Sequence, residues 1–212
     1  GARTFNGGVT MGGTTPTLTI GDAGAEDAKI VFDGNAQDYH IGLDDSADTL
    51  VIGKGSALGT TTSMSFDANG IITKPLQPCF FVYKSAGQDV TNTSNNDITF
   101  DTERFDLNAD FGSNVFTAPV TGKYHLSASV GYINANASGT IMVYINTSNF
   151  EILGHRRDAS GDDSVYGTAQ MSAVVDMDAN DTAKLIIDSS HDDDYALESA
   201  TYRTYFSGYL VA

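Results

Sequence analysis

The chain lacks most features of disulfide-bonded and membrane-spanning proteins. Its 212 residues include four prolines, no tryptophan and one cysteine, Cys79. A single cysteine excludes an internal disulfide, and secreted animal modules of this size commonly carry disulfides. We therefore expect a bacterial or viral source, or a fold stabilised by assembly. No signal peptide and no run of roughly 18 apolar residues is present, so we expect no membrane insertion. The start at Gly1 rather than Met indicates a processed chain or a fragment.

Basic residues are also scarce. The chain has 11 Lys and Arg against 27 Asp and Glu, a net charge of −16. Such a surface repels phosphate backbones and anionic membranes, so nucleic acid is not an expected partner. The excess acid either keeps a Thr- and Tyr-rich protein soluble or indicates a high-salt environment, where screening weakens self-repulsion.

Motifs for catalysis and cofactor binding are missing as well. None of the four histidines has a metal-binding spacing, and no nucleophile elbow, P-loop or dinucleotide fingerprint occurs. We expect no enzyme and no resident cofactor. Glycan hydrolysis stays open, because it needs two carboxylates in a groove and acids are plentiful. Asp106, Glu151 and Asp176 each lie between two large apolar residues, although alternation along a strand would turn them toward water.

Short apolar runs separated by Gly, Asn, Asp, Ser and Thr fill the sequence, which is typical of an all-β protein. No stretch keeps a 3.6-residue period, so almost no helix is expected. The segment Lys74-Pro75-Leu76-Gln77-Pro78 holds two prolines and cannot be a central strand. We therefore predict a stem over residues 1–74 and a head over residues 75–212.

The predicted stem repeats itself. Thr17-Leu18-Thr19-Ile20-Gly21 returns as Thr49-Leu50-Val51-Ile52-Gly53, and Phe32-Asp33-Gly34-Asn35 returns as Phe66-Asp67-Ala68-Asn69-Gly70. One short hairpin is too small to be stable alone. The repeat therefore predicts an ordered β-repeat stem, in which strands stack along an axis or several chains wind together. The alternative is a pair of flexible hairpins.

The predicted head shows clean alternation. Apolar and small polar residues alternate over 124–132, 169–177 and 183–187, as in half-buried strands, and we add strands at 79–84, 98–105, 115–117 and 150–154. Two strands, at 141–145 and 204–211, are apolar on both faces and need a second cover. A partner subunit is the simplest cover. The predicted interface residues are Met142, Tyr144, Tyr205, Tyr209 and Val211.

The head resembles the C1q globular-head family. Phe100, Asp106 and Phe111 follow the family spacing, Phe116 comes after four residues instead of six, and Gly122-x-Tyr124 falls in place. The ending Tyr205-Phe206-Ser207-Gly208-Tyr209-Leu210-Val211 is similar to the family's last strand. The resemblance implies a ten-stranded jelly roll related to tumour necrosis factor that packs as a homotrimer, with the two doubly apolar strands facing the axis.

One acidic loop carries a metal prediction. Asp192, Asp193 and Asp194 follow His191 and form either a solvated turn or a Ca²⁺ site. Some relatives of this fold hold Ca²⁺ near the top of the trimer. The cationic run at 155–158, His-Arg-Arg-Asp, either pairs with neighbouring acids or recognises an acidic glycan.

The stem resembles repeats in fibre-like structural proteins of bacteriophages, especially marine ones, through residues 33–39 and 41–48. This implies a tail or capsid fibre on the virion surface whose trimeric head attaches to a host cell-surface glycan or protein. The alternative is a secreted, extracellular C1q-like recognition or adhesion protein, which would usually carry a collagen tract or coiled coil that this sequence lacks. A tailspike-like glycan hydrolase is the third reading.

Overall fold

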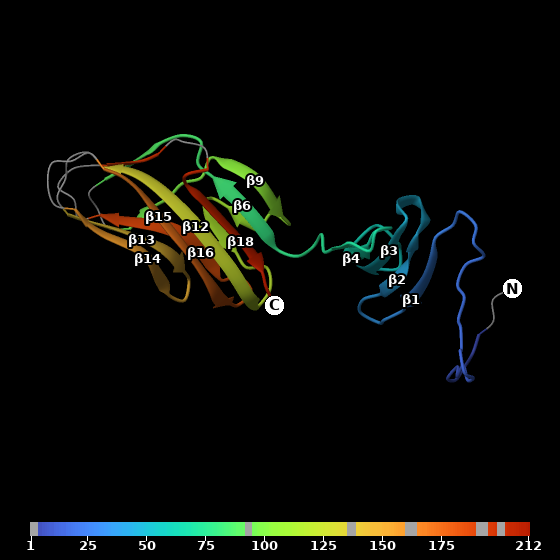
Figure 1. Ribbon diagram of the computed structural model, residues 1–212. Coiled ribbons are helices and arrows are strands. Elements are labelled where there is room, and N and C mark those ends of the chain that lie inside the picture. Colours follow the sequence, from blue (N-terminus) through green and yellow to red (C-terminus); the bar gives the residue numbers. More distant parts are fainter. Residues whose placement is uncertain (1–3, 92–94, 135–138, 160–164, 190–194, 199–201) are drawn as a thin grey trace. The chain divides into compact units, whose positions relative to one another are not determined.

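The regular structure of the described chain is almost entirely antiparallel strands (Figure 1). The computed structural model describes residues 4–91, 95–134, 139–159, 165–189, 195–198 and 202–212. The chain divides into two units, Gly1–Pro75 and Leu76–Ala212, which are described separately. The expectation of an all-β protein is confirmed. A single turn of 3-10 helix, Asp45–Ala47, lies in the first unit, and no helix in the described part of the chain is long and apolar enough to cross a membrane.

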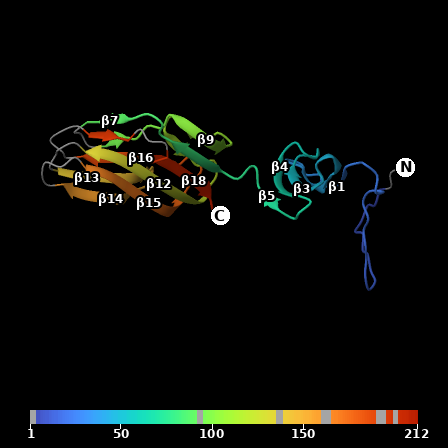
Figure 2. The same ribbon diagram turned by 45° about the horizontal axis from the view of Figure 1, so that its top comes forward.

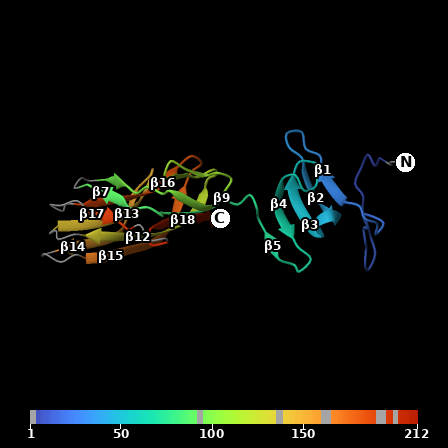
Figure 3. The ribbon, with the colours of Figure 1, turned by 90° about the horizontal axis from the view of Figure 1, so that it is seen from above.

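The first unit is one five-stranded meander, with its strands side by side in the order β1-β2-β3-β4-β5 (Figure 3). Phe32 and Phe66 end β1 and β4, so the repeated Phe-Asp motif is a strand end followed by a turn. In the second copy, the Asp67 carboxylate accepts hydrogen bonds from the backbone N–H groups of Asn69 and Ile71. The strands are β1 Ala28–Phe32, β2 Tyr39–Asp44, β3 Thr49–Lys54, β4 Thr62–Phe66 and β5 Ile72–Thr73.

The other repeat behaves differently from its prediction. Residues 49–53 lie in β3, whereas the similar residues 17–21 form no strand. A strand needs a hydrogen-bonded neighbour, and β3 has β2 and β4 on its two sides. In the described structure, residues 17–21 pair with no strand of their own chain. They therefore do not form a strand, although their sequence favours one.

The second unit is a jelly-roll sandwich of two sheets, whose long strands run in similar directions (Figure 2). The first sheet has the order β7-β17-β12-β18-β6-β9, with β15 on the other side of β12, and the second has the order β10-β11-β16-β13-β14, with β8 on β16. The strands are β6 Cys79–Tyr83, β7 Gln88–Val90, β8 Asn96–Asp97, β9 Thr102–Leu107, β10 Phe111–Gly112, β11 Val115–Thr117, β12 Gly122–Asn134, β13 Gly139–Thr147, β14 Glu151–Ala159, β15 Val165–Met177, β16 Thr182–Ser189, β17 Tyr195–Leu197 and β18 Tyr205–Leu210.

The core lies between the two sheets and is formed by alternate residues of each strand. In β12 the predicted apolar face is buried, from Tyr124 to Tyr132. Phe80 is packed between Phe116 at 4.7 Å and Phe206 at 5.1 Å, measured between ring centroids. This interlayer packing fixes which side of each strand faces outward, and so defines the two outer faces of the sandwich.

Some predicted strands are wrong in their bounds: the strand expected over 150–154 is β14, which extends to Ala159. The sequence predicts a strand over 98–105, but β9 begins at Thr102. The Thr99 N–H donates to the Gln88 side chain and the Phe100 N–H donates to the Asn114 side chain. Side-chain acceptors take the place of a neighbouring strand there, which alternation along the sequence does not reveal. Ile98 is nevertheless buried.

Candidate interaction surface

Between the row of Tyr209, His125 and Val174 and the row of Tyr83, Tyr205 and Ser129, the register assigns no Asp, Glu, Lys or Arg to the outer face of the first sheet. Residues directly opposite in antiparallel strands share a face, so the register assigns its members. We call this surface the uncharged face. It comprises Gln170, Ser172 and Val174 of β15, His125, Ser127 and Ser129 of β12, Tyr205, Ser207 and Tyr209 of β18, Cys79, Phe81 and Tyr83 of β6, and Thr102, Phe105 and Leu107 of β9.

Aromatic rings gather on one half of the uncharged face. Phe81 lies at the centre, with ring centroids 5.3 Å from Tyr205 and 6.1 Å from Phe105. Tyr202 adds a ring from the segment before β18, 4.7 Å from Tyr83. Small serines on β12 and β18 form the other half, so the face has an aromatic ridge beside a shallow region where a partner could approach the sheet closely.

These aromatic side chains are incompletely covered by their own chain. Phe105, Tyr202 and Tyr209 are exposed, and Phe81 and Tyr205 are half-buried. Burying one such side chain is worth about 1.5–3 kcal/mol. A contiguous exposed apolar surface of this kind is typical of a protein–protein contact.

Ion pairs border the uncharged face at two ends. Lys123 Nζ lies 2.6 Å from Asp176 Oδ1 in the row beyond His125. At the other end, Arg203 pairs with the buried carboxylate of Glu198, beside Gly131. An uncharged centre with a polar, paired rim is the usual anatomy of an interface.

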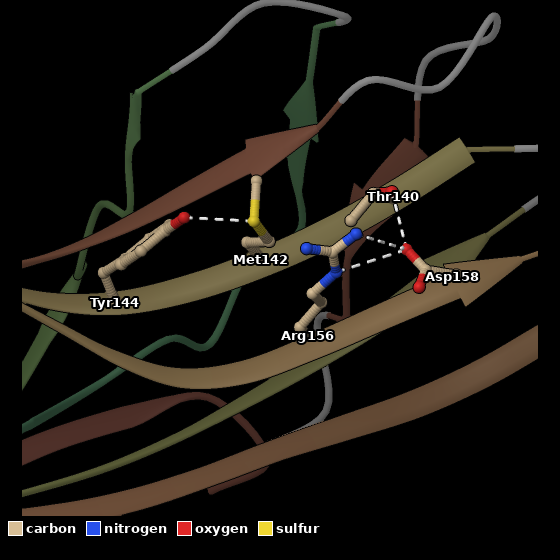
Figure 4. A network of polar contacts seen from close by, with 5 residues as sticks. All are labelled: Thr140, Met142, Tyr144, Arg156 and Asp158. Atoms are coloured by element: carbon tan, nitrogen blue, oxygen red, sulfur yellow. Dashed lines mark hydrogen bonds and ion pairs between the residues drawn. The ribbon is translucent and has the colours of Figure 1, made fainter.

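The outer face of the second sheet has the opposite character (Figure 4). Asp158 accepts a hydrogen bond from Thr140 Oγ1 at 2.7 Å and pairs with Arg156 at 3.3 Å. The Tyr144 hydroxyl donates to the Met142 sulfur at 3.1 Å. Other charged members are Asp97, Glu151, Lys184 and Asp188. We call this surface the charged face; on it Lys184 pairs with Asp97, and Glu151 accepts a hydrogen bond from Asn146.

The five predicted interface residues therefore fall into two groups on different sides of the sandwich. Tyr205 and Tyr209 lie on the uncharged face and Val211 follows directly after β18. Met142 and Tyr144 lie on the charged face, across the core from the tyrosines. The structure brings the members of each group together but not the two groups. All five stay predictions.

Sequence reasoning missed most of the aromatic ridge. Phe81, Tyr83 and Phe105 were not among the predicted interface residues, although β6 reads Cys-Phe-Phe-Val-Tyr and is apolar on both faces. That pattern is the same signal that singled out the terminal strand. It was available at residues 79–83.

The acids considered for hydrolysis do not form a pair with one another. Asp176 pairs with Lys123, and Glu151 accepts a hydrogen bond from Asn146. Asp106 instead accepts from the backbone N–H groups of Asp110 and Phe111. Desolvation, and then the charge of Asp106, raises the pKa of Asp110. Its Oδ2 atom is buried without a hydrogen-bond partner in the described structure.

The cationic run divides between the two sides of β14. Arg156 points to the charged face and pairs with Asp158, whereas His155 points inward, with Nε2 3.0 Å from the Tyr132 hydroxyl. Desolvation lowers the pKa of His155, and the charge of Arg157 lowers it further.

Metal binding has no support among the described residues, where no three His, Cys, Asp or Glu side chains come close enough to hold an ion. Asp192, Asp193 and Asp194 lie outside the described residues. The Ca²⁺ site at these three residues therefore stays a prediction.

No protein-family model matches the sequence, and neither does any curated protein. Among solved structures, the globular domain of zebrafish complement 1qA protein is 19% identical, with a TM-score of 0.46; the match covers 64% of this chain and 98% of that one. Murine APRIL at pH 8.5 is 10% identical, with a TM-score of 0.45 and coverage of 64% and 99%. At these identities the likeness concerns the fold, so the function has to be argued from the side chains.

Proposed function

We propose that this protein is a structural fibre component whose head self-associates as a homotrimer through the uncharged face and attaches to a host cell surface. The supporting observation is that the residues assigned to the uncharged face include no Asp, Glu, Lys or Arg, in a chain of net charge −16. Copies of such a chain repel one another, and approach is least costly where no carboxylate has to be desolvated.

A closed ring of three copies can cover the uncharged face of every copy, whereas an open polymer leaves it exposed at one end. The uncharged face is a sheet face, and a three-fold arrangement lets each copy cover it with a different surface of its neighbour. The C1q-like resemblance of the sequence implies the same number of subunits. A closed ring also gives one end at which loops of several copies present a shared binding surface for a glycan or protein.

The unit before the head favours a fibre over a cellular protein. It is a β sheet of short strands rather than a collagen tract or coiled coil. The cellular C1q-like reading has the same head and the same assembly, placed extracellularly. Immunogold labelling of producing cultures separates the two, because an antibody to the head decorates virions in one case and cells or secreted material in the other.

Two charge substitutions test the assembly. Tyr205→Asp with Tyr209→Asp places carboxylates in the uncharged face and should dissociate the particle. Leu153→Asp is the matched control, because Leu153 is 48% exposed on β14 of the charged face and Tyr209 is 47% exposed. We expect light scattering to give a monomer mass for the double variant and an unchanged mass for the control. A folded double variant that keeps the wild-type mass would place the interface elsewhere.

A further inference from the structure

The five-stranded sheet of the first unit also has a bare apolar face. The register places Ile30, Ile41, Ile52 and Met64 in one row across four strands. A second row runs from Leu43 through Leu50 and Phe66 to Ile72. We call the surface made by these rows, with Phe32 and Tyr39 beside them, the stem face. Most of its side chains are exposed, and the rest are half-buried.

Part of the other side of the same sheet is covered by its own chain. The segment after β3 folds over it, with the Gly55 carbonyl 2.8 Å from His40 Nδ1 and the Ser56 carbonyl 2.7 Å from Lys29 Nζ. His40 and Val51 are buried as a result. The chain thus covers part of one side, on which Val31 stays 37% exposed, and leaves the apolar side without a cover.

A single sheet whose apolar face is exposed to solvent has little stability in water. Three or more strands become stable when their apolar face is packed against something. Eight aliphatic or aromatic side chains in two adjacent rows form a contiguous patch rather than scattered exposed residues. The sheet therefore calls for a second layer.

We propose that the stem face is a self-association surface, covered by the same face of other copies of this chain. Its charge supports this occupant. Both rows lack Asp and Glu, and Lys54 lies beside them at the end of β3, so like copies meet without burying a carboxylate.

Tethering adds to this attraction. The inference rests on the proposed function, because heads that are joined hold the attached first units at high local concentration. Under that condition a modest apolar patch is sufficient to associate. The stem would then be a set of sheets whose apolar sides face one another around a common axis.

Thiol labelling tests the stem face directly. In the full chain carrying Cys79→Ser, a single cysteine is introduced as Ile52→Cys on the stem face or as Val31→Cys on the opposite side. In one copy these positions are equally exposed, at 36% and 37%. A maleimide should react about ten-fold more slowly with the cysteine at 52 than at 31 if other copies cover the stem face.

The particle mass, measured on the same samples, shows whether each labelling result comes from an assembled particle or from a monomer. Protection at 52 in a particle of several chains supports the inference. Equal labelling in an assembled particle overturns it and leaves the head interface standing. Protection at 52 in a monomer means that the same chain supplies the cover, which also overturns it. Equal labelling in a monomer rejects both the stem face and the head assembly.

Discussion

The rings of Phe81 and Tyr205 stack on adjacent strands with their centroids 5.3 Å apart and their planes inclined by 20°. They come from β6 and β18, which are separated by most of the second unit in sequence. The stack is the centre of the aromatic ridge on the uncharged face. Rigid, preorganised rings of this kind are the residues that contribute most to protein–protein binding.

Truncating a ring at the edge of this ridge should weaken assembly. Phe105→Ala removes a side chain that is 43% exposed, so it costs little in a single copy. If a neighbour buries the ring, we expect a loss of about 1–3 kcal/mol, or roughly 5- to 150-fold in the dissociation constant. Sedimentation at a series of concentrations measures this change.

The control uses the same substitution at similar exposure. Phe150 is 46% exposed and lies between β13 and β14, two strands of the second sheet. Phe150→Ala should leave the dissociation constant unchanged. Equal effects of the two substitutions would show that the ridge has no special part in association.

The close contact between Gly53 and His40 predicts a stability effect in the first unit. A Cβ atom on Gly53 would lie 2.6 Å from the His40 ring and 2.7 Å from the Thr61 carbonyl oxygen. Gly53→Ala should therefore destabilise the sheet by about 1–3 kcal/mol through overpacking. Gly12→Ala is the control, because nothing lies within 4 Å of a Cβ there. Hydrogen exchange of the β2 and β3 amides reads out the effect locally, and equal protection in both variants would contradict the packing.

Acid should weaken the second unit through His155. Its pKa is lowered by desolvation and by Arg157, so the folded state prefers the neutral imidazole that faces Tyr132. The stability from this preference is present above the unfolded-state pKa of about 6.5 and is lost as pH falls through the lowered value. We expect the Tm to fall more between pH 7.5 and pH 5 in the wild type than in His155→Gln. If the Tm of both proteins falls equally between pH 7.5 and pH 5, His155 does not cause the loss of stability in acid.

Asp110 should behave in the opposite sense. Burial and Asp106 raise the pKa of its carboxyl group, so the charged form destabilises the fold as pH rises through that raised pKa. Asp110→Asn should raise the Tm at pH 7, and the gain should shrink as acid protonates the native carboxyl group. A Tm that drops at pH 7 would mean that the ionised carboxylate has a favourable partner.

Local patterns predicted much of this fold. Alternation from Tyr124 to Tyr132 identified β12 and its buried side, because the period of a strand is a local property. The double apolarity of residues 141–145 and 204–211 correctly marked strands with one side in the core and a second apolar side outside it.

What sequence could not supply was pairing between distant segments. Met142 and Tyr205 carry the same local signal, yet sheet membership places them on opposite outer faces. Residues 17–21 resemble β3 but form no strand, since strand formation depends on a neighbour rather than on propensity alone. The aromatic ridge likewise arises only when β6, β9 and β18 are brought side by side.

The central claim is that copies of this chain associate through the uncharged face, and the mass of the particle in solution tests it most directly. Light scattering on the full chain should give about three times the 22.4 kDa of one copy at near-physiological salt. A single species at the mass of one chain, unchanged as concentration rises, would contradict the account.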